Sequence, residues 1–290
     1  WFADGAGKLR PGSGLWAADL TTGRIVPLAL HRAEYDDGFR IYRAPSWSAD
    51  SGRIAFTAVG SLDRSLIGFA LADGRSASFE RPDRFGASGY GVFAPTGSKL
   101  AFAQAIIRGP SAGRVATIRV VEPGGRVAGC VFRVAPSDYA RLCPTDASRH
   151  GGRPVQPYVA GLRWTPDGER LLFALGPTAS DRERVSLWLL SPLQREEPRR
   201  LSPDDGYGYF APYPIGDRYF GAGRCRGGRY EAVLLSRDGR IMEAHPVPSD
   251  DWDWRPDGTA VVCSDNARRA AQPAGLTIVR FARVGVSSLR

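Results

Sequence analysis

The chain has 290 residues, of which 43% are hydrophobic and 24% charged, and its formal net charge is +9 at pH 7. Such a composition supplies enough apolar side chains for a core and excludes an intrinsically disordered chain. No apolar run reaches the ~18 residues that a transmembrane helix needs. The basic residues are scattered among aspartates and glutamates. We expect no nucleic-acid partner, because nucleic-acid binders gather basic residues on one face with stacking aromatics.

The first predicted element is a β-hairpin from Leu15 to Leu30 that turns at Thr22-Gly23. A phrase then recurs, in which an aromatic strand leads into a Pro/Asp-Gly turn and an apolar strand. Asp-Gly between apolar runs is typical of a tight hairpin, and recurrence of such a unit is typical of a repeat fold. The copies of this phrase are 45–56, 93–102, 164–173 and 254–263, with a degenerate copy at 212–220.

A second predicted hairpin follows each phrase, so each repeat contains four antiparallel strands. Four strands are the content of one propeller blade, and the spacing fits a blade period of about 40–50 residues. The sequence therefore predicts one all-β domain, a six-bladed β-propeller of four-stranded blades. The first blade is expected to lack its innermost strand, as in a piece of a longer polypeptide. The expected blades are approximately 1–30, 31–81, 82–155, 156–201, 202–249 and 250–290.

One repeat is roughly 25 residues longer than the ~40–50 of the others, and its extra loop is expected from about Val134 to Pro157. Cys130 and Cys143 bracket the beginning of this insertion. A disulfide between them would close a loop and stabilise the fold by about 3 kcal/mol. We predict this disulfide, the alternative being two unrelated thiols; a second bridge, between Cys225 and Cys263, is left open. A disulfide would indicate an oxidising compartment.

The phrase resembles the blade repeat of TolB-type six-bladed propellers, and the closest copies begin at Trp164-Thr-Pro-Asp167-Gly168 and Trp254-Arg-Pro-Asp257-Gly258. The resemblance covers the propeller but not the family's N-terminal α/β domain. It implies a binding role towards envelope proteins, outside the cytoplasm. The same repeat occurs in prolyl-oligopeptidase-type peptidases, oligogalacturonate lyases and membrane-anchored sensors, so the resemblance specifies a fold better than a function.

Candidate catalytic residues are few. The histidines, His31, His150 and His245, lie far apart, and no Gly-x-Ser-x-Gly elbow is present. We therefore expect no catalytic residues, no metal and no cofactor. The Asp-Gly aspartates are interpreted as turn residues. Three acidic pairs could supply oxygen ligands for Ca²⁺. We interpret them instead as solvated carboxylates or as partners of arginine. They are Asp36-Asp37, Asp204-Asp205 and Asp250-Asp251, with Asp253 following.

Aromatic and charged residues precede the phrases by a few positions, where they are expected at one mouth of the central channel. Tyr, Trp and Arg dominate protein-recognition hot spots, so this mouth is the candidate binding site; the alternative is that these side chains plug the channel. The candidate residues are Tyr42, Arg43, Tyr90, Tyr158, Tyr207, Tyr209, Asp251 and Trp252. The aromatic residues of the phrase itself, Trp47, Trp164 and Trp254, are expected to pack between neighbouring blades.

The sequence thus favours a non-catalytic propeller that binds a protein or peptide, in a periplasmic or other extracytoplasmic setting. Such a chain would be a monomer or a part of a larger polypeptide. One rival hypothesis is a metal-dependent lyase or hydrolase acting on acidic polysaccharide, with His31, His150 or His245 as ligands. Another is the sensor domain of a membrane-anchored bacterial protein.

Overall fold

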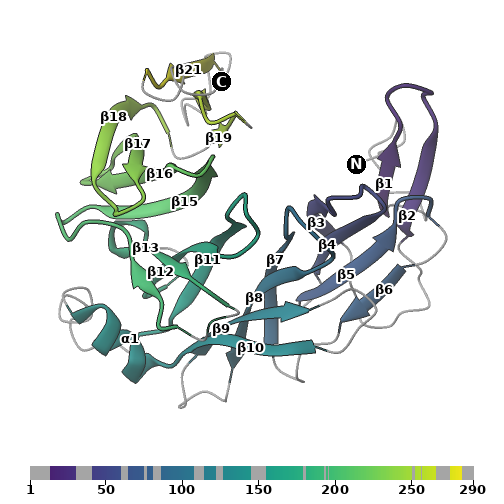
Figure 1. Ribbon diagram of the computed structural model, residues 1–290, viewed down its shortest axis with the longest axis horizontal. Helices are drawn as coiled ribbons and strands as arrows, with labels where there is room; N and C mark the ends of the chain where they lie inside the picture. The colour runs from purple at the N-terminus through teal and green to yellow at the C-terminus, as the bar shows by residue number, and fades with distance from the viewer. Residues whose placement is uncertain are drawn as a thin grey trace, which may run out of the picture. The chain divides into compact units, whose positions relative to one another are not determined.

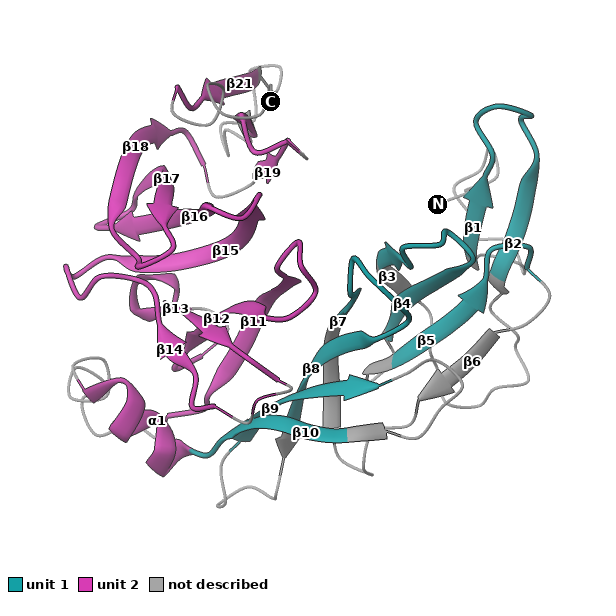
Figure 2. Ribbon diagram, viewed as in Figure 1, with its two compact units in different colours: residues 1–135 teal, residues 136–290 magenta. Residues whose placement is uncertain are grey.

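The structure is a computed structural model that describes residues 14–30, 41–59, 65–74, 77–80, 86–107, 114–121, 127–144, 155–178, 181–192, 194, 196–249, 252–255, 257–265 and 275–282. It divides into two compact units, residues 1–135 and residues 136–290 (Figure 2). Both units are built of antiparallel strands, as Figure 1 shows.

The first unit contains a hairpin and two four-stranded blades. In the hairpin, β1 (Gly14–Ala18) pairs with β2 (Ile25–Leu30). One parallel bridge, Ser65 to Ala87, joins the two blades into a single hydrogen-bonded sheet. Blade 1 is β3 (Ile41–Trp47), β4 (Arg53–Val59), β5 (Ser65–Leu71) and β6 (Ala77–Glu80). Blade 2 is β7 (Gly86–Phe93), β8 (Leu100–Ile107), β9 (Arg114–Val121) and β10 (Val127–Val134).

The second unit begins with a short helix, α1 (Pro136–Leu142), and continues with three blades. Blade 3 is β11 (Tyr158–Trp164), β12 (Leu171–Gly176), β13 (Ser186–Leu190) and β14 (Arg199–Arg200), with the 3₁₀ turn η1 (Arg182–Arg184) before β13. Blade 4 is β15 (Gly208–Ile215), β16 (Tyr219–Arg226), β17 (Arg229–Ser236) and β18 (Ile241–Val247). Blade 5 is β19 (Trp252–Trp254), β20 (Ala260–Asp265) and β21 (Gly275–Arg280).

The architecture confirms an all-β propeller of antiparallel sheets and corrects the blade count. Over the described residues there are five blades of three or four strands rather than six. The expected first unit is present only as the two-stranded β1–β2 ladder, and the expected hairpin partner of β21 falls on residues outside the described ones. The insertion after β10 contains α1, a helix that the sequence analysis did not predict.

The Asp-Gly turns form as their residue types predict. In the turn before β20, the Asp257 carboxylate accepts hydrogen bonds from the Thr259 hydroxyl at 2.6 Å and the Thr259 amide at 3.0 Å. These bonds lower the pKa of the Asp257 carboxyl. Gly258 takes the positive φ, +70°, that such a turn requires. The aspartates of the repeated phrase are therefore structural.

Apolar cores form where successive blades face each other. Between blades 3 and 4 the core includes Leu172, Leu187 and Tyr209, and between blades 4 and 5 it includes Leu234 and Trp254. A core between blades 1 and 2 lies around Phe102. The face of β12 and β13 that carries Leu172, Leu187 and Leu189 is buried against blade 4.

The expectation for the phrase tryptophans is partly wrong. Trp164 and Trp254 are each 5% exposed, but Trp47 is 49% exposed. Trp254 is covered because its indole lies against Gly221 of β16 in the preceding blade. The unit that precedes Trp47 contributes only the two-stranded ladder β1–β2 to the described structure. Burial at this position therefore depends on the neighbouring blade and not on the phrase.

Candidate functional site

Four of the eight predicted site residues have described side chains, and all four belong to the second unit. Tyr207 directly precedes β15, Tyr209 is the second residue of that strand, and Trp252 begins β19 of the next blade. Tyr158 is the first residue of β11, opposite Gly176 of β12. Of the others, the side chains of Tyr42, Arg43 and Tyr90, and the whole of Asp251, lie outside the described part of the chain.

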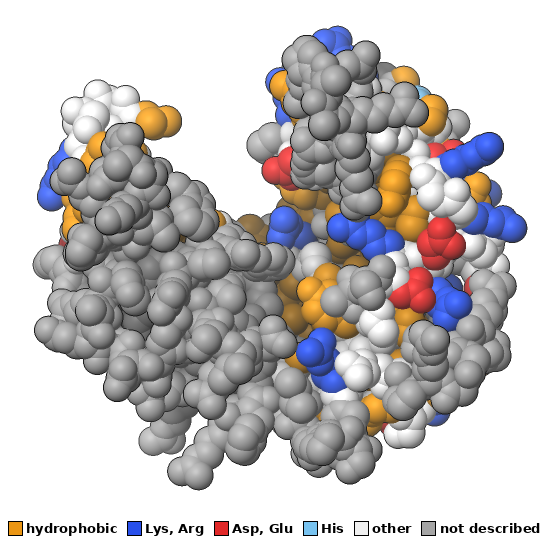
Figure 3. All heavy atoms as spheres, turned by 180° about the vertical axis from the view of Figure 1, so that it is seen from behind, with side chains coloured by type: hydrophobic (Ala, Val, Ile, Leu, Met, Phe, Trp, Pro, Cys, Tyr) orange, Lys and Arg blue, Asp and Glu red, His pale blue; other side chains and the backbone are white. Residues whose placement is uncertain are grey.

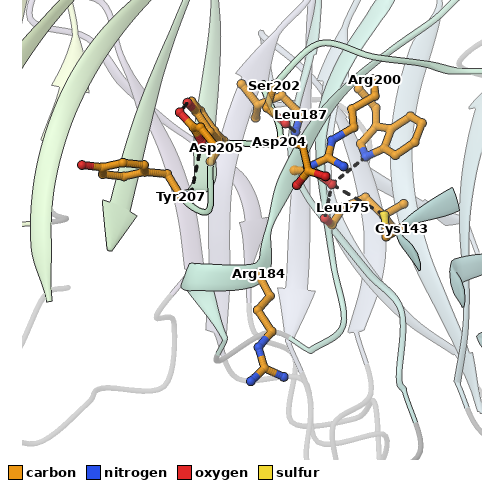
Figure 4. A network of polar contacts seen from close by, with 12 residues as sticks. Cys143, Leu175, Arg184, Leu187, Arg200, Ser202, Asp204, Asp205 and Tyr207 are labelled. Carbon is orange, nitrogen blue, oxygen red and sulfur yellow. Dashed lines mark hydrogen bonds and ion pairs between the residues drawn. The ribbon is translucent and has the colours of Figure 1, made fainter. Parts of the chain in front are cut away.

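Asp205 joins Tyr207 and Tyr209 into one cluster. Its Oδ1 accepts a hydrogen bond from the Tyr207 amide at 3.1 Å (Figure 4), and its Oδ2 accepts one from the Tyr209 hydroxyl at 2.7 Å. Tyr209 is fully buried in the core between blades 3 and 4. Burial, together with the hydrogen bond to Asp205, raises the pKa of the Tyr209 phenol well above its usual value. Tyr209 is therefore a neutral donor that positions the Asp205 carboxylate.

Arg224 completes this cluster from β16. Its Nε lies 2.6 Å from Glu231 Oε2, and its Nη1 lies 3.4 Å from Asp205 Oδ2. The Arg224 guanidinium also covers the Tyr207 ring at 4.2 Å from the ring centroid, a cation–π contact. We call Asp205, Tyr207, Tyr209, Arg224 and Glu231 the Asp205 cluster. Its two carboxylates both bind Arg224 and hold the guanidinium over the ring.

A second aromatic group lies on the opposite face of the same strands. Phe210 stacks on Trp252 at 5.2 Å between ring centroids, and the Arg182 guanidinium lies 5.1 Å from the Phe210 centroid. Gly223 makes the stack possible, because a Cβ at this position would lie 1.9 Å from Trp252 Cζ2. The Trp252 indole N–H is buried without an acceptor in the structure, one of the buried polar atoms left unpartnered.

The fold thus brings Tyr207 and Tyr209 together through Asp205, and it places Trp252 on the opposite face of β15, stacked on Phe210. The sequence analysis missed Phe210, Arg224 and Arg226, whose guanidinium is the second one over Tyr207 at 5.7 Å. It noted Asp205 only as one of an acidic pair. A signal was present, since β16 alternates Arg224 and Arg226 with glycine and cysteine, as expected of a strand with one polar face.

Charged side chains elsewhere on this unit are mixed in sign. Figure 3 shows basic side chains interspersed with aspartate and glutamate over the described surface; in this unit all of them are arginines. Arg200 pairs with Asp204 at 3.6 Å, and Arg184 pairs with Asp181 at 3.4 Å. The interpretation of the pair Asp204-Asp205 as partners of arginine is thereby confirmed.

His245 is the one predicted alternative metal ligand within the described residues. Its Nε2 lies 3.3 Å from Glu243 Oε2, and its ring packs edge-on against Phe281 at 5.0 Å. His31 and His150 fall outside the described residues. The described part of the chain contains no group of three or more metal-ligating side chains. Nor does it contain a helix of the length and apolarity needed to span a membrane.

The predicted disulfide is absent, and all four cysteines are thiols. The buried Cys143 Sγ lies 3.7 Å from Ser186 Oγ, which in turn donates to the Leu175 carbonyl oxygen. Figure 4 shows Cys143 and Leu175 close together. The exposed Cys130 Sγ instead contacts the Phe132 carbonyl oxygen at 3.0 Å. The helix α1 explains the difference, because Tyr139 is buried and its hydroxyl donates to the Arg184 carbonyl at 3.3 Å. The insertion is thus restrained by packing rather than by a covalent bridge.

Comparison with known proteins gives structural matches only. No protein-family model matches the chain, and no curated protein matches it. Solved structures do match: TolB from Acinetobacter baumannii has a TM-score of 0.50 at 18% identity, covering 80% of this chain and 48% of that one. An oligogalacturonate lyase in complex with manganese has a TM-score of 0.60 at 12% identity, covering 95% and 74%. The β-propeller domain of the Trilobed protease from Pyrococcus furiosus has a TM-score of 0.56 at 14% identity, covering 92% of this chain and 71% of that one.

These similarities define the class of fold. The chain has a TolB-like β-propeller fold that it also shares with an oligogalacturonate lyase and with a peptidase propeller domain. It spans about half the length of TolB, 48%. At 12–18% identity the likeness extends to the fold alone, because one propeller fold hosts many unrelated functions.

Proposed function

We propose that this chain is a non-catalytic propeller that binds a protein or peptide partner, in an extracytoplasmic setting. The binding surface is the end of blade 4 at which β15 begins and β16 ends. We call its exposed and partly exposed residues the blade-4 patch: Arg182, Tyr207, Arg226 and Trp252. The buried Phe210 supports Arg182 and Trp252 from below. The setting rests on the resemblance to TolB-type propellers, since the cysteines no longer support an oxidising compartment.

One observation carries this proposal: two guanidinium–aromatic contacts lie at the same end of blade 4, one on each face of its strands. Arg224 covers Tyr207 and Arg182 covers Phe210, with centroid distances of 4.2 and 5.1 Å. Tyr, Trp and Arg in a partly desolvated, rigid setting are the side chains that contribute most to protein–protein binding. The Asp205 cluster supplies the rigidity, because Arg224 is held by Asp205 and Glu231. A preorganised surface loses little conformational entropy when a partner binds.

Site-specific photo-crosslinking in the native cells tests the proposal. A photoreactive phenylalanine analogue is placed at position 207, or as a matched control at Arg218, an exposed turn residue at the other end of the same hairpin. We expect a protein adduct from position 207 and none from position 218, with the partner identified by mass spectrometry. Tyr209 is left unchanged because it is part of the core. Equal adducts at both positions, or none at either, would contradict the proposed surface.

A further inference from the structure

The tip of the β16–β17 hairpin carries two arginines opposite each other. Arg226 is the last residue of β16 and Arg229 the first of β17, and they are register partners across the two-residue turn Gly227-Gly228. Both glycines have positive φ, +58° and +74°, as the tight hairpin turn requires. Directly opposed residues project from the same face of a hairpin, so the two arginine side chains leave the turn on the same side.

This like-charged pair has no counter-ion in the described structure. Both side chains are exposed, and none of the ion pairs of the described residues involves Arg226 or Arg229. The next register pair on the same face of the hairpin shows the contrast, since Arg224 there faces Glu231 and bonds to it at 2.6 Å. Like charges directly opposite each other destabilise a strand pair, and an anion between them would remove the repulsion.

The surroundings of this pair restrict where an anion can lie. The Arg226 guanidinium is 5.7 Å from the Tyr207 ring centroid, so the aromatic ring borders the place where an anion would bind to Arg226. The nearest acidic contact at the turn is Glu183, whose Oε1 accepts a hydrogen bond from the Gly228 amide at 3.3 Å. Glu183 therefore holds the turn backbone, and Arg226 and Arg229 are both exposed to solvent.

We propose that Arg226 and Arg229 bind a carboxylate-rich segment of the protein partner, with Tyr207 packing against the same segment. This assignment rests on the proposed function, which it deepens by naming the chemistry of the partner. A guanidinium fork matches the geometry of a carboxylate and can bind it through two parallel hydrogen bonds. The two opposed forks would together engage acidic side chains two positions apart in an extended peptide, because alternate side chains project to the same side.

Binding of defined peptides to the full chain tests this inference. The probes are a fluorescein-labelled peptide rich in Asp and Glu, its Asn/Gln counterpart, and a labelled uronic-acid oligomer. The variant R226Q/R229Q is compared with R218Q/R240Q, which removes the same charge from exposed arginines at the opposite end of blade 4. We expect R226Q/R229Q to weaken binding of the acidic peptide on the order of tenfold, and the control pair to change it less than about twofold.

Each outcome decides the inference. Equal weakening by both double variants would show long-range attraction to a basic protein and would overturn it. Equal binding of the acidic and neutral peptides would overturn it as well, as would binding of the uronic-acid oligomer alone. Because these results concern charge chemistry, they are separate from the crosslinking test. An adduct at position 207 without acidic-peptide selectivity would keep the proposed function and reject only this inference.

Discussion

The indole of Trp254 occupies the space left by the missing side chain of Gly221. A Cβ on Gly221 would lie 2.3 Å from Trp254 Cζ2, closer than any real contact allows. Tyr213 stacks on the same indole at 6.1 Å between ring centroids, and Phe281 packs against it at 5.1 Å. Blade 5 is thus joined to blade 4 by one aromatic residue of the repeated phrase inserted at a glycine of the preceding blade.

We expect Gly221→Ala to destabilise the fold by about 1–3 kcal/mol, because the added methyl overpacks the core between blades 4 and 5. The Trp254→Phe variant removes the ring atoms that the methyl would meet. In the Trp254→Phe background the cost of Gly221→Ala should therefore be smaller by at least about 0.5 kcal/mol, a coupling that urea unfolding of the four proteins measures. Strictly additive costs would show that the two residues do not share this contact.

A matched pair of glycines separates backbone strain from steric overlap. Gly239 and Gly227 both have positive φ, +88° and +58°, but a Cβ on Gly239 would lie 1.9 Å from the Leu201 carbonyl oxygen, whereas nothing lies within 4 Å of one on Gly227. We expect Gly227→Ala to cost about 1–2 kcal/mol from strain alone. Gly239→Ala should cost about 2–4 kcal/mol. Chemical denaturation measures the loss of unfolding free energy in each variant. A smaller loss for Gly239→Ala than for Gly227→Ala would show that the added methyl does not meet the Leu201 carbonyl oxygen.

Tyr209 should make the fold sensitive to alkaline pH. Burial and the Asp205 hydrogen bond raise the pKa of Tyr209 in the folded state above its unfolded value of about 10. The stability from the protonated phenol is complete below pH ~10 and is lost as the pH rises, because only the unfolded chain then releases the proton. The wild-type protein should therefore lose stability more steeply above pH ~10 than Tyr209→Phe, by up to about 1.4 kcal/mol per pH unit.

Urea unfolding of both proteins at pH 8 and pH ~10.5 measures this difference. The other tyrosines are unchanged between the two proteins and serve as the internal control. At pH 8 the Tyr209→Phe variant should be less stable by about 1–2 kcal/mol, since the Asp205 carboxylate loses a donor. If the unfolding free energies of the two proteins fell equally with pH above pH ~10, Tyr209 would not keep its proton in the folded state.

The cysteines are expected to react as four thiols. Alkylation in denaturant without reductant should add four labels, and in the native protein Cys130 should react first because it is exposed while Cys143, Cys225 and Cys263 are buried. Mass measurement counts the labels. Two labels in denatured protein matured through its native export route would show a disulfide and restore the support that a bridge gives to an oxidising compartment.

Local sequence signals predicted most of the strands and turns. Thr165 and Asp167 form the same hydrogen-bonded turn as Ser236 and Asp238, because an aspartate before glycine bonds to its own neighbours. The Asp205 cluster was predicted only in part. Tyr207 and Tyr209 were recognised by residue type, but Arg224 lies 19 positions from Asp205 and meets it only through the pairing of β15 with β16. Strand register is not visible in the residues themselves.

The amino-acid sequence by itself determined the repeating antiparallel hairpins, because alternating apolar residues and Asp-Gly turns act over a few positions. Only the tertiary structure decided which equivalent residues are buried: Trp254 is covered by blade 4, while Trp47 in the same phrase is exposed. It also decided that Cys143 packs beside Ser186 instead of bridging to Cys130. Burial and pairing depend on contacts between distant segments, and a local pattern contains no information about which segment will lie opposite.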